Sequence, residues 1–296
     1  MKYIKSPLNY TGGKYRFLDY IIPQIPKDID TFVDLFCGGL NVGINVSAKH
    51  IIANDRLKQV IDFYRYLYIS DFKDVLESIF DIIKLYGLSD ENDDAYYALR
   101  SDYNKDMSNP ILLYMLACHS FSNFIRFNNV GEFNYSFGQR TFNKSMKLNL
   151  SQFVNKMKSM DMIFVNNDFR HFDYSVLTEN DFVYVDPPYL ISDASYNVYD
   201  GGWCKQDDED LFDILDSLTK INVRWMMSNV LSHGGIENNE LNRFSEKYHV
   251  LHIDADYSHC VGTVKKDGFS DEVIITNYEL KKGSSYSKSK LFTFKE

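Results

Sequence analysis

The sequence predicts an α/β fold in which one sheet domain carries a helical and hairpin insertion. Strand-like and helix-like stretches alternate near both ends of the 296-residue chain, whereas the stretch between them has mainly helical periodicity. A chain of this length can form one large domain or two joined ones. We therefore expect a discontinuous sheet domain of residues 1–56 and 157–280, an inserted domain of residues 57–156, and a flexible polar tail of residues 281–296.

The first alternating stretch contains two expected strands. Residues 31–36 are strand-like and run into a Gly-Gly pair, after which residues 40–48 are expected to form a helix. The second strand, residues 51–53, ends beside Asn54 and Asp55. The first strand therefore ends at a glycine turn, and the second ends beside polar residues.

The inserted stretch is expected to be helical from about residue 57 to 123 and again from 148 to 160. Between these helices, residues 128–131 read Asn-Asn-Val-Gly and separate two segments rich in aromatic residues. This pattern predicts the turn of a β-hairpin.

The second alternating stretch completes the sheet domain. Its expected strands are residues 163–165, 182–185, 223–227, 250–253 and 272–277, and its expected helices are residues 208–219 and 237–247.

The composition is that of a soluble globular protein, with 45% hydrophobic and 25% charged residues. We expect a cytoplasmic protein, because the chain has no apolar run of membrane-spanning length and no apolar stretch at its start. The four cysteines are scattered and the histidines lack metal spacing, so reduced thiols and no metal site are expected. The net charge of −9 argues against indiscriminate nucleic-acid binding but leaves room for a local basic face.

Three short motifs carry possible chemistry. In Asp34-Leu35-Phe36-Cys37-Gly38-Gly39, glycines after a buried strand allow close backbone approach to a ligand, and Asp55 at the next strand end is placed to hold ribose hydroxyls. There is no GxGxxG, and a tight turn with a solvated acid remains the alternative. In Tyr10-Thr11-Gly12-Gly13-Lys14, a glycine loop brings a cation to a helix start, which alone is more often only a turn.

The third motif is Asp186-Pro187-Pro188-Tyr189, which follows the expected strand 182–185. Open α/β sheets bind ligands at the carboxyl ends of their strands. The prolines fix the backbone and leave the Pro187 carbonyl free to accept a hydrogen bond. A carboxylate, a carbonyl and a flat ring suit an exocyclic amine on a planar base, although Asp-Pro can also simply begin a turn.

Together these motifs, in this order, resemble the Dam-like (α-group) DNA adenine-N6 methyltransferases. The insertion resembles that family's target-recognition segment, in the stretches 119–128 and 131–138, and the residues around Asp186 are most similar to the phage-type branch. The resemblance covers roughly residues 7–278. It implies a Rossmann-like S-adenosylmethionine-dependent methyltransferase sheet with an inserted helical and β-hairpin target-recognition domain.

The resemblance also implies a cofactor, S-adenosyl-L-methionine, and a methyl transfer to N6 of an adenine flipped out of duplex DNA. The implied catalytic residues are Asp186, Pro187, Pro188 and Tyr189. The implied cofactor-binding residues are Tyr10, Lys14, Asp34, Phe36, Gly38, Gly39, Asp55, Asp168, Phe169 and Asp186. No metal is implied.

A DNA face is indicated by charge. Between residues 119 and 158, six basic residues stand against one acid, a net charge of +5 in an acidic chain. A guanidinium on a hairpin can pair with guanine, which makes Arg126 the base-reading candidate. The residues expected to bind DNA are Ser122, Asn123, Phe124, Arg126, Asn128, Ser136 and Arg140.

Several alternatives stay open. Ser136, Phe124 and Asn9 differ from the residues that GATC-methylating relatives usually carry, so the recognition sequence is not fixed. The chain could serve as a restriction companion, an orphan enzyme or a phage enzyme, with an endonuclease as a possible partner and an open oligomeric state. An RNA or protein-glutamine methyltransferase and a non-catalytic DNA-binding module are the rival functions. Trp203 is expected either to cover the flipped base or to anchor the core.

Overall fold

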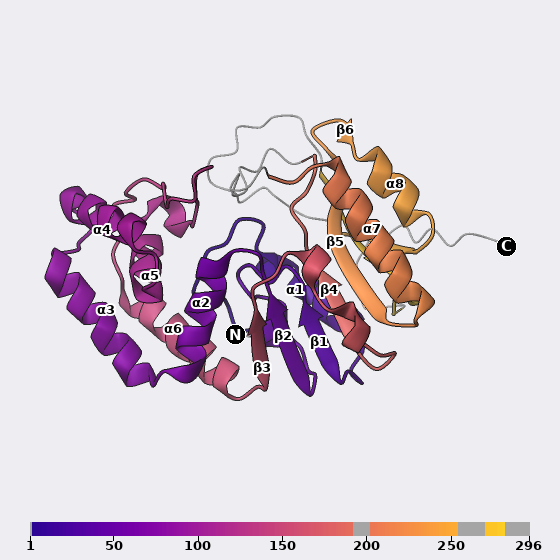
Figure 1. Cartoon of the computed structure of the whole chain (residues 1–296), viewed down its shortest axis with the longest axis horizontal. Helices are drawn as coiled ribbons and strands as arrows, with labels where there is room; N and C mark the ends of the chain where they lie inside the picture. The colour runs from indigo at the N-terminus through magenta and orange to yellow at the C-terminus, as the bar shows by residue number, and fades with distance from the viewer. Residues whose placement is uncertain (1, 192–201, 254–269, 282–296) are drawn as a thin grey trace.

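The computed structural model describes residues 2–191, 202–253 and 270–281. These residues form an eight-stranded sheet in the order β3-β2-β1-β4-β5-β8-β7, with β6 paired to β5. Helices lie against both faces of the sheet, so the α/β class is confirmed (Figure 1). The expected tail lies outside the described residues, apart from its first residue, Lys281.

All the expected strands of the sheet form, with small differences in length except for β5, which continues six residues beyond its expected end at residue 227. They are β1 (Thr31–Asp34), β2 (His50–Asn54), β3 (Met162–Val165), β4 (Phe182–Val185), β5 (Arg224–His233), β7 (His249–Ile253) and β8 (Ser270–Thr276), and the sequence did not predict the short β6 (Ile236–Glu237). Strands β3, β2, β1, β4 and β5 pair in parallel, whereas β8 pairs antiparallel with both β5 and β7.

The centre of the sheet positions the site. Strand β1 pairs with β2 on one side and β4 on the other, and Asp34 lies in register with Ala53 and Tyr184. All four residues of β4 are buried. Because the three strands are parallel, the loops that follow them emerge at the same edge, where the strand order reverses and α/β sheets bind ligands.

The helices cover the sheet as two hydrophobic clusters. Residues of α1, α2 and α6 pack on one face, and residues of α7 and α8 pack on the other, where Trp225 stacks on Phe244. The helices are α1 (Leu18–Gln24), α2 (Lys58–Ile69), α3 (Phe72–Tyr86), α4 (Asp93–Lys105), α5 (Pro110–His119), α6 (Lys144–Lys158), α7 (Lys205–Lys220) and α8 (Asn239–Ser245). Short 3₁₀ turns are η1 (Lys14–Phe17), η2 (Gly43–Asn45), η3 (Phe121–Asn123), η4 (Phe169–His171) and η5 (Tyr174–Val176). None of the helices in the described residues is long and apolar enough to cross a membrane.

The helix expected over residues 40–48 is wrong, since only the single turn η2 forms there. Leu40 adopts a positive φ of 54°, which interrupts a right-handed helix at its expected start. The Asn45 side chain accepts from the Ile4 backbone N–H at 2.8 Å and donates to the Ile4 carbonyl at 2.8 Å. The segment therefore serves to hold the N-terminal stretch of the chain, and side-chain bonds of this kind compete with helix formation.

The inserted stretch contains the predicted helices, and α6 begins earlier than expected. It starts at Lys144 because the Asn143 side chain accepts from the Met146 backbone N–H at 3.0 Å and caps the first turn. Figure 1 shows α3, α4 and α5 at one end of the molecule, beyond α2 and β3. One hydrophobic cluster nevertheless runs without a break from Phe182 of the sheet to Tyr96 of α4.

Candidate active site

A cavity of about 340 Å³ lies at the carboxyl edge of β1, β2 and β4. Its size is within the range of small-molecule sites. All ten residues predicted to bind a cofactor line it, together with Pro187 and Pro188. Residues from five separate stretches of sequence therefore meet at one cavity, because the ends of the parallel strands lie at the same edge of the sheet. In the described parts of the chain, no group of three or more His, Cys, Asp or Glu residues is arranged to hold a metal.

The glycine turn after β1 is held from both sides. Gly38 has a φ of +42°, and a Cβ there would lie 2.9 Å from Cδ1 of Tyr10, so a side chain would be strained and crowded. Asp55 accepts from the Gly38 N–H at 2.9 Å through one oxygen and from the Leu57 N–H at 2.8 Å through the other. Tyr64 donates to the Gly38 carbonyl at 2.8 Å. The turn is thus fixed before any ligand arrives.

Asp34 forms the floor of the cavity. Its side chain is buried, with the residue only 2% exposed, and one oxygen accepts from the Gly43 N–H at 2.9 Å. The pKa of Asp34 is raised to about 7: burial is the main cause, the hydrogen bond from Gly43 offsets part of the rise, and the nearby charges of Asp186 and Asp55 add to it. A carboxyl group with a pKa near 7 is only partly ionised at neutral pH, and its ionised form binds a cation most strongly.

Three aromatic rings line one wall of the cavity. The ring centroids of Phe36 and Phe169 lie 5.5 Å apart, and Trp203 lies 5.7 Å from Phe36 and 5.5 Å from Phe169. The indole N–H of Trp203 donates to the buried carboxylate of Asp208 at 2.8 Å. Trp203 also packs against the hydrophobic core cluster of α7 and α8, so the core-anchoring alternative is supported, and the residue forms part of the cavity wall as well.

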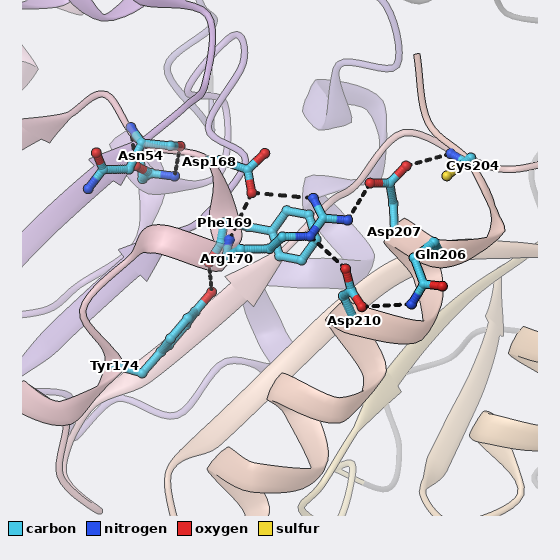
Figure 2. A network of polar contacts seen from close by, with 10 residues as sticks. Asn54, Asp168, Phe169, Arg170, Tyr174, Cys204, Gln206, Asp207 and Asp210 are labelled. Carbon is cyan, nitrogen blue, oxygen red and sulfur yellow. Dashed lines mark hydrogen bonds and ion pairs between the residues drawn. The ribbon is translucent and has the colours of Figure 1, made fainter. Parts of the chain in front are cut away.

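Asn54 was missed as a site residue, although it ends a predicted strand. Its amide donates to the Leu35 carbonyl at 2.9 Å, and its oxygen accepts from the Asn167 N–H at 3.1 Å. It thereby fastens the loop after β3, which carries Asp168 and Phe169, to the end of β1. Figure 2 shows Asn54 beside this loop.

The Asp-Pro-Pro-Tyr turn after β4 is built around an ion pair. The ammonium of Lys14 lies 2.7 Å from Oδ1 of Asp186, and the two side chains are only 6% and 17% exposed. Lys14 also donates to the Gly12 carbonyl at 2.8 Å and lies 4.9 Å from the centre of the Tyr189 ring. Tyr189 donates to Asp186 at 3.3 Å. Burial raises the pKa of Asp186, and the charge of Lys14 offsets part of that rise.

Residues 119–138, which we call the recognition segment after the expectation above, contain the predicted turn, but the flanks of this turn pair only at isolated bridges. Phe127 pairs antiparallel with Phe133, and Asn128 exchanges backbone and side-chain hydrogen bonds with Glu132 across the turn. Nε of Arg126 donates to the Asn134 side chain at 2.9 Å, and the guanidinium lies 5.1 Å from the centre of the Tyr135 ring. A guanidinium has five N–H donors, so this contact fixes its direction and leaves donors for a base.

The other predicted DNA-binding residues gather around this segment. Ser122 and Asn123 have positive φ values of 54° and 60°, and Asn123 donates to the Cys118 carbonyl at the end of α5 at 2.8 Å. Arg140 donates to Asn123 at 3.3 Å. Ser136 is exposed, and its carbonyl accepts from the Phe121 N–H at 2.9 Å.

The basic surface is smaller than the sequence suggested. Helix α6 is 15 residues long, or about 22 Å. Lys158 at its far end donates to the Ser70 carbonyl that follows α2, so Lys156 and Lys158 lie near the start of β3. Arg126 lies within the recognition segment and Arg140 donates to Asn123 in it, whereas Lys147 near the start of α6 lies 5.7 Å from the centre of the Phe80 ring of α3.

The recognition segment reaches the cavity. Phe124 bridges to Asn9, whose side chain donates to the Ser122 carbonyl at 2.7 Å, and Ile125 lines the cavity itself. Asn9 immediately precedes the loop that carries Tyr10 and Lys14.

Comparison with known proteins decides the family. Residues 10–259 match the model of the D12 class N6 adenine-specific DNA methyltransferases. The chain belongs to this family. The match spans strands β1 to β7 and residues 119–138, and every residue that lines the cavity lies within it.

Individual relatives agree with this assignment. The chain is 43% identical to modification methylase StsI of Streptococcus sanguinis over 95% of its own length and 44% of the relative's. It is 43% identical to the type II methyltransferase M.FokI of Planomicrobium okeanokoites over 93% of its length and 43% of the relative's. A DNA adenine methylase of Escherichia coli (strain K12) is 25% identical over 90% of the chain and 94% of that protein. The chain thus spans less than half of the StsI and FokI relatives.

Proposed function

We propose that the chain transfers a methyl group from S-adenosyl-L-methionine to N6 of an adenine in a specific site of duplex DNA. The observation that carries this proposal is the cavity that brings the glycine turn, the aromatic wall and Asp186 together, with Ile125 of the recognition segment also in its lining. A cofactor and a base can then meet in one space. The DNA adenine family and the names of the relatives support DNA over RNA or glutamine as the substrate.

The cavity fits the cofactor at each of its parts. The aromatic rings of Phe36, Phe169 and Trp203 suit a purine, and Asp55 at the end of β2 suits ribose hydroxyls. Asp34 on the buried floor suits a cationic amine. When bound, S-adenosyl-L-methionine supplies an electrophilic methyl group on a sulfonium.

Asp186 and Pro187 act on the target amine. The lone pair of an adenine amine is delocalised into the ring, which makes it a poor nucleophile. Hydrogen bonds from the amine to the Asp186 carboxylate and the Pro187 carbonyl favour a tetrahedral nitrogen that is aimed at the methyl group. Tyr189 provides a ring that offsets part of the few kcal/mol needed to unstack a base.

The proposal has a direct test. The purified chain is incubated with methyl-labelled S-adenosyl-L-methionine and unmethylated genomic DNA, and the product is sequenced for modified bases. We expect N6-methyladenine within one recurrent sequence. Label found only on RNA or protein, or no transfer at all, would overturn the proposal. The recurrent sequence would also show whether the site is GATC, and co-expression with a candidate endonuclease would show whether the modification protects DNA.

Arg126 is expected to read one base. Arg126→Ala should relax base choice at one position of the site, at a cost of about 1–3 kcal/mol in discrimination, because a bidentate contact to guanine is lost. The measurement is the methylation rate on a panel of duplexes with single base-pair changes. Arg140→Ala is the matched control, since it removes a neighbouring charge. An Arg126→Ala loss that is equal for all sequences would contradict base reading.

Asp34 is expected to make cofactor binding depend on pH. Its pKa of about 7 means that the carboxyl becomes protonated as the pH falls below 7 and then no longer attracts an ammonium. The dissociation constant of S-adenosyl-L-homocysteine should therefore rise as the pH is lowered from 8 to 6. Asp34→Asn should bind more weakly and lose that part of the pH dependence. An unchanged pH profile in the variant would refute the role of Asp34.

A further inference from the structure

Arg170 joins two parts of the chain that lie far apart in the sequence. Its Nε lies 2.6 Å from Asp210, its Nη2 lies 2.5 Å from Asp207, and its Nη1 lies 3.4 Å from Asp168. Asp168 precedes η4, whereas Asp207 and Asp210 belong to the first turns of α7. Figure 2 shows the guanidinium between these three carboxylates.

The carboxylates that hold Arg170 are themselves fixed. Asp207 accepts from the Cys204 backbone N–H at 2.6 Å, which closes the first turn of α7. Asp210 accepts from the Gln206 side chain at 2.9 Å, and Asp168 accepts from the Arg170 backbone N–H at 3.0 Å. Burial acts to raise the pKa of Asp207, but hydrogen bonds from Arg170 and Cys204 hold that pKa below its ordinary value; the pKa of Asp210 is lowered by hydrogen bonds from Gln206 and then from Arg170. We call Arg170 with Asp168, Asp207 and Asp210 the Arg170 clasp.

Asp168 of the clasp lines the cavity, whereas Arg170 packs on Phe169 of the aromatic wall and does not line the cavity itself. The guanidinium lies 4.5 Å from the centre of the Phe169 ring, and Phe169 lines the cavity. On the α7 side, Trp203 directly precedes Cys204 and completes the same wall. Among the described residues, Arg170 does not line the cavity, so we expect it to act on a ligand through Phe169, Asp168 and Trp203.

The geometry distinguishes this clasp from an isolated surface ion pair. A single exposed pair contributes little, because it must order two long side chains in water. Here one planar guanidinium uses three of its nitrogens on three carboxylates, which gives directional, charge-assisted contacts. An ammonium is a point charge that cannot reproduce this fork.

We infer that Arg170 is a positioning residue for the adenine end of the cofactor. It fastens the Asp168–Phe169 turn to the start of α7 and so sets the spacing of Phe169 and Trp203. The inference rests on the proposed function, since it takes the aromatic wall as the place where the cofactor adenine binds.

Arg170→Gln tests the inference. Isothermal titration with S-adenosyl-L-homocysteine should give a dissociation constant about tenfold higher than that of the wild type, as expected when one member of a salt-bridge network is removed. The KM for S-adenosyl-L-methionine should rise in parallel, whereas the KM for DNA should stay unchanged. Lys247→Gln is the control, because it removes a 2.7 Å ion pair with Asp216, which lies on α7 like Asp207 and Asp210 but does not line the cavity. This variant should leave the dissociation constant of S-adenosyl-L-homocysteine and both KM values unchanged.

Two further variants make the outcome decisive. Arg170→Lys should restore only part of the affinity, and it also serves if the Gln variant does not fold. The double variant Arg170→Gln with Asp210→Asn should lose less affinity for S-adenosyl-L-homocysteine than the sum of the losses in the two single variants, because both substitutions act on the same clasp. Wild-type affinity in Arg170→Gln, or equal rises in both KM values, would overturn the inference. Failure of the wild type to bind S-adenosyl-L-homocysteine would instead overturn the proposed function, and the inference with it.

Discussion

Alanine at position 186 is expected to lower the rate of methyl transfer by about 10²–10³-fold, the range seen when one preorganised polar contact to a reacting group is removed. Asp186 lines the cavity beside the Pro187 carbonyl, and it is the carboxylate in that turn. Without it, the amine of a flipped adenine keeps one acceptor and is no longer aimed at the methyl group. The measurement is single-turnover methylation of a duplex that carries the modified sequence, with S-adenosyl-L-homocysteine titration to show that the cavity is intact.

Asparagine at the same position separates the two roles that the carboxylate can have. Asp186→Asn retains an oxygen acceptor but loses the charge that Lys14 faces at 2.7 Å. We expect its rate to fall between those of the wild type and Asp186→Ala, because orientation of the amine matters more than removal of its proton. Turnover of the alanine variant close to the wild-type rate would contradict the assignment of Asp186.

The sequence predicted the sheet well, and also the convergence of the strand ends on one cavity, for a physical reason. Buried strands have continuous apolar runs, as in Phe182–Val185, and the residue that ends such a run is easily seen. In a parallel sheet, strand ends meet at one edge, so Asp34, Asp55 and Asp186 could be expected to converge from their positions alone. The structure places all three in the cavity lining.

Features that depend on contacts between distant segments could not be predicted in this way. The helix expected over residues 40–48 is replaced by a turn because Asn45 bonds to Ile4, a partner 41 residues away. The Arg170 clasp and the place of Trp203 depend likewise on where α7 meets the loop after β3. No local pattern or spacing encodes such a meeting.

The basic surface shows a different limit of the sequence. A count of charges over residues 119–158 treats all the charged side chains in this range as neighbours. In the structure, α6 carries Lys156 and Lys158 away from the recognition segment. The direction of a helix relative to a binding face follows from packing, here from Leu150, Phe153 and Met157 against the core, and not from charge.

Lys14→Met is expected to destabilise the protein by about 3 kcal/mol. The substitution removes the cation of the Lys14–Asp186 ion pair and leaves the buried Asp186 carboxylate without a compensating charge. This value is at the lower end of the usual range, since the Asp186 side chain keeps 17% of its exposure. Burial already raises the pKa of Asp186, and the loss of the Lys14 charge should raise that pKa further. The measurement is the free energy of unfolding in urea for the wild type and Lys14→Met.

The pH dependence of this loss has a definite sign. A carboxyl whose pKa is higher in the folded state than in the unfolded state binds more protons when folded, so its unfavourable effect on stability grows as the pH rises. The deficit of Lys14→Met should therefore be larger at about pH 8.5 than at about pH 5.5, where Asp186 is more often neutral. Lys14→Met combined with Asp186→Asn should regain much of the stability at the higher pH, because the uncompensated charge is gone. If the double variant instead shows the sum of the two single losses, the ion pair is not the cause, and Lys14 stabilises the fold only through its stem and its contact with the Gly12 carbonyl.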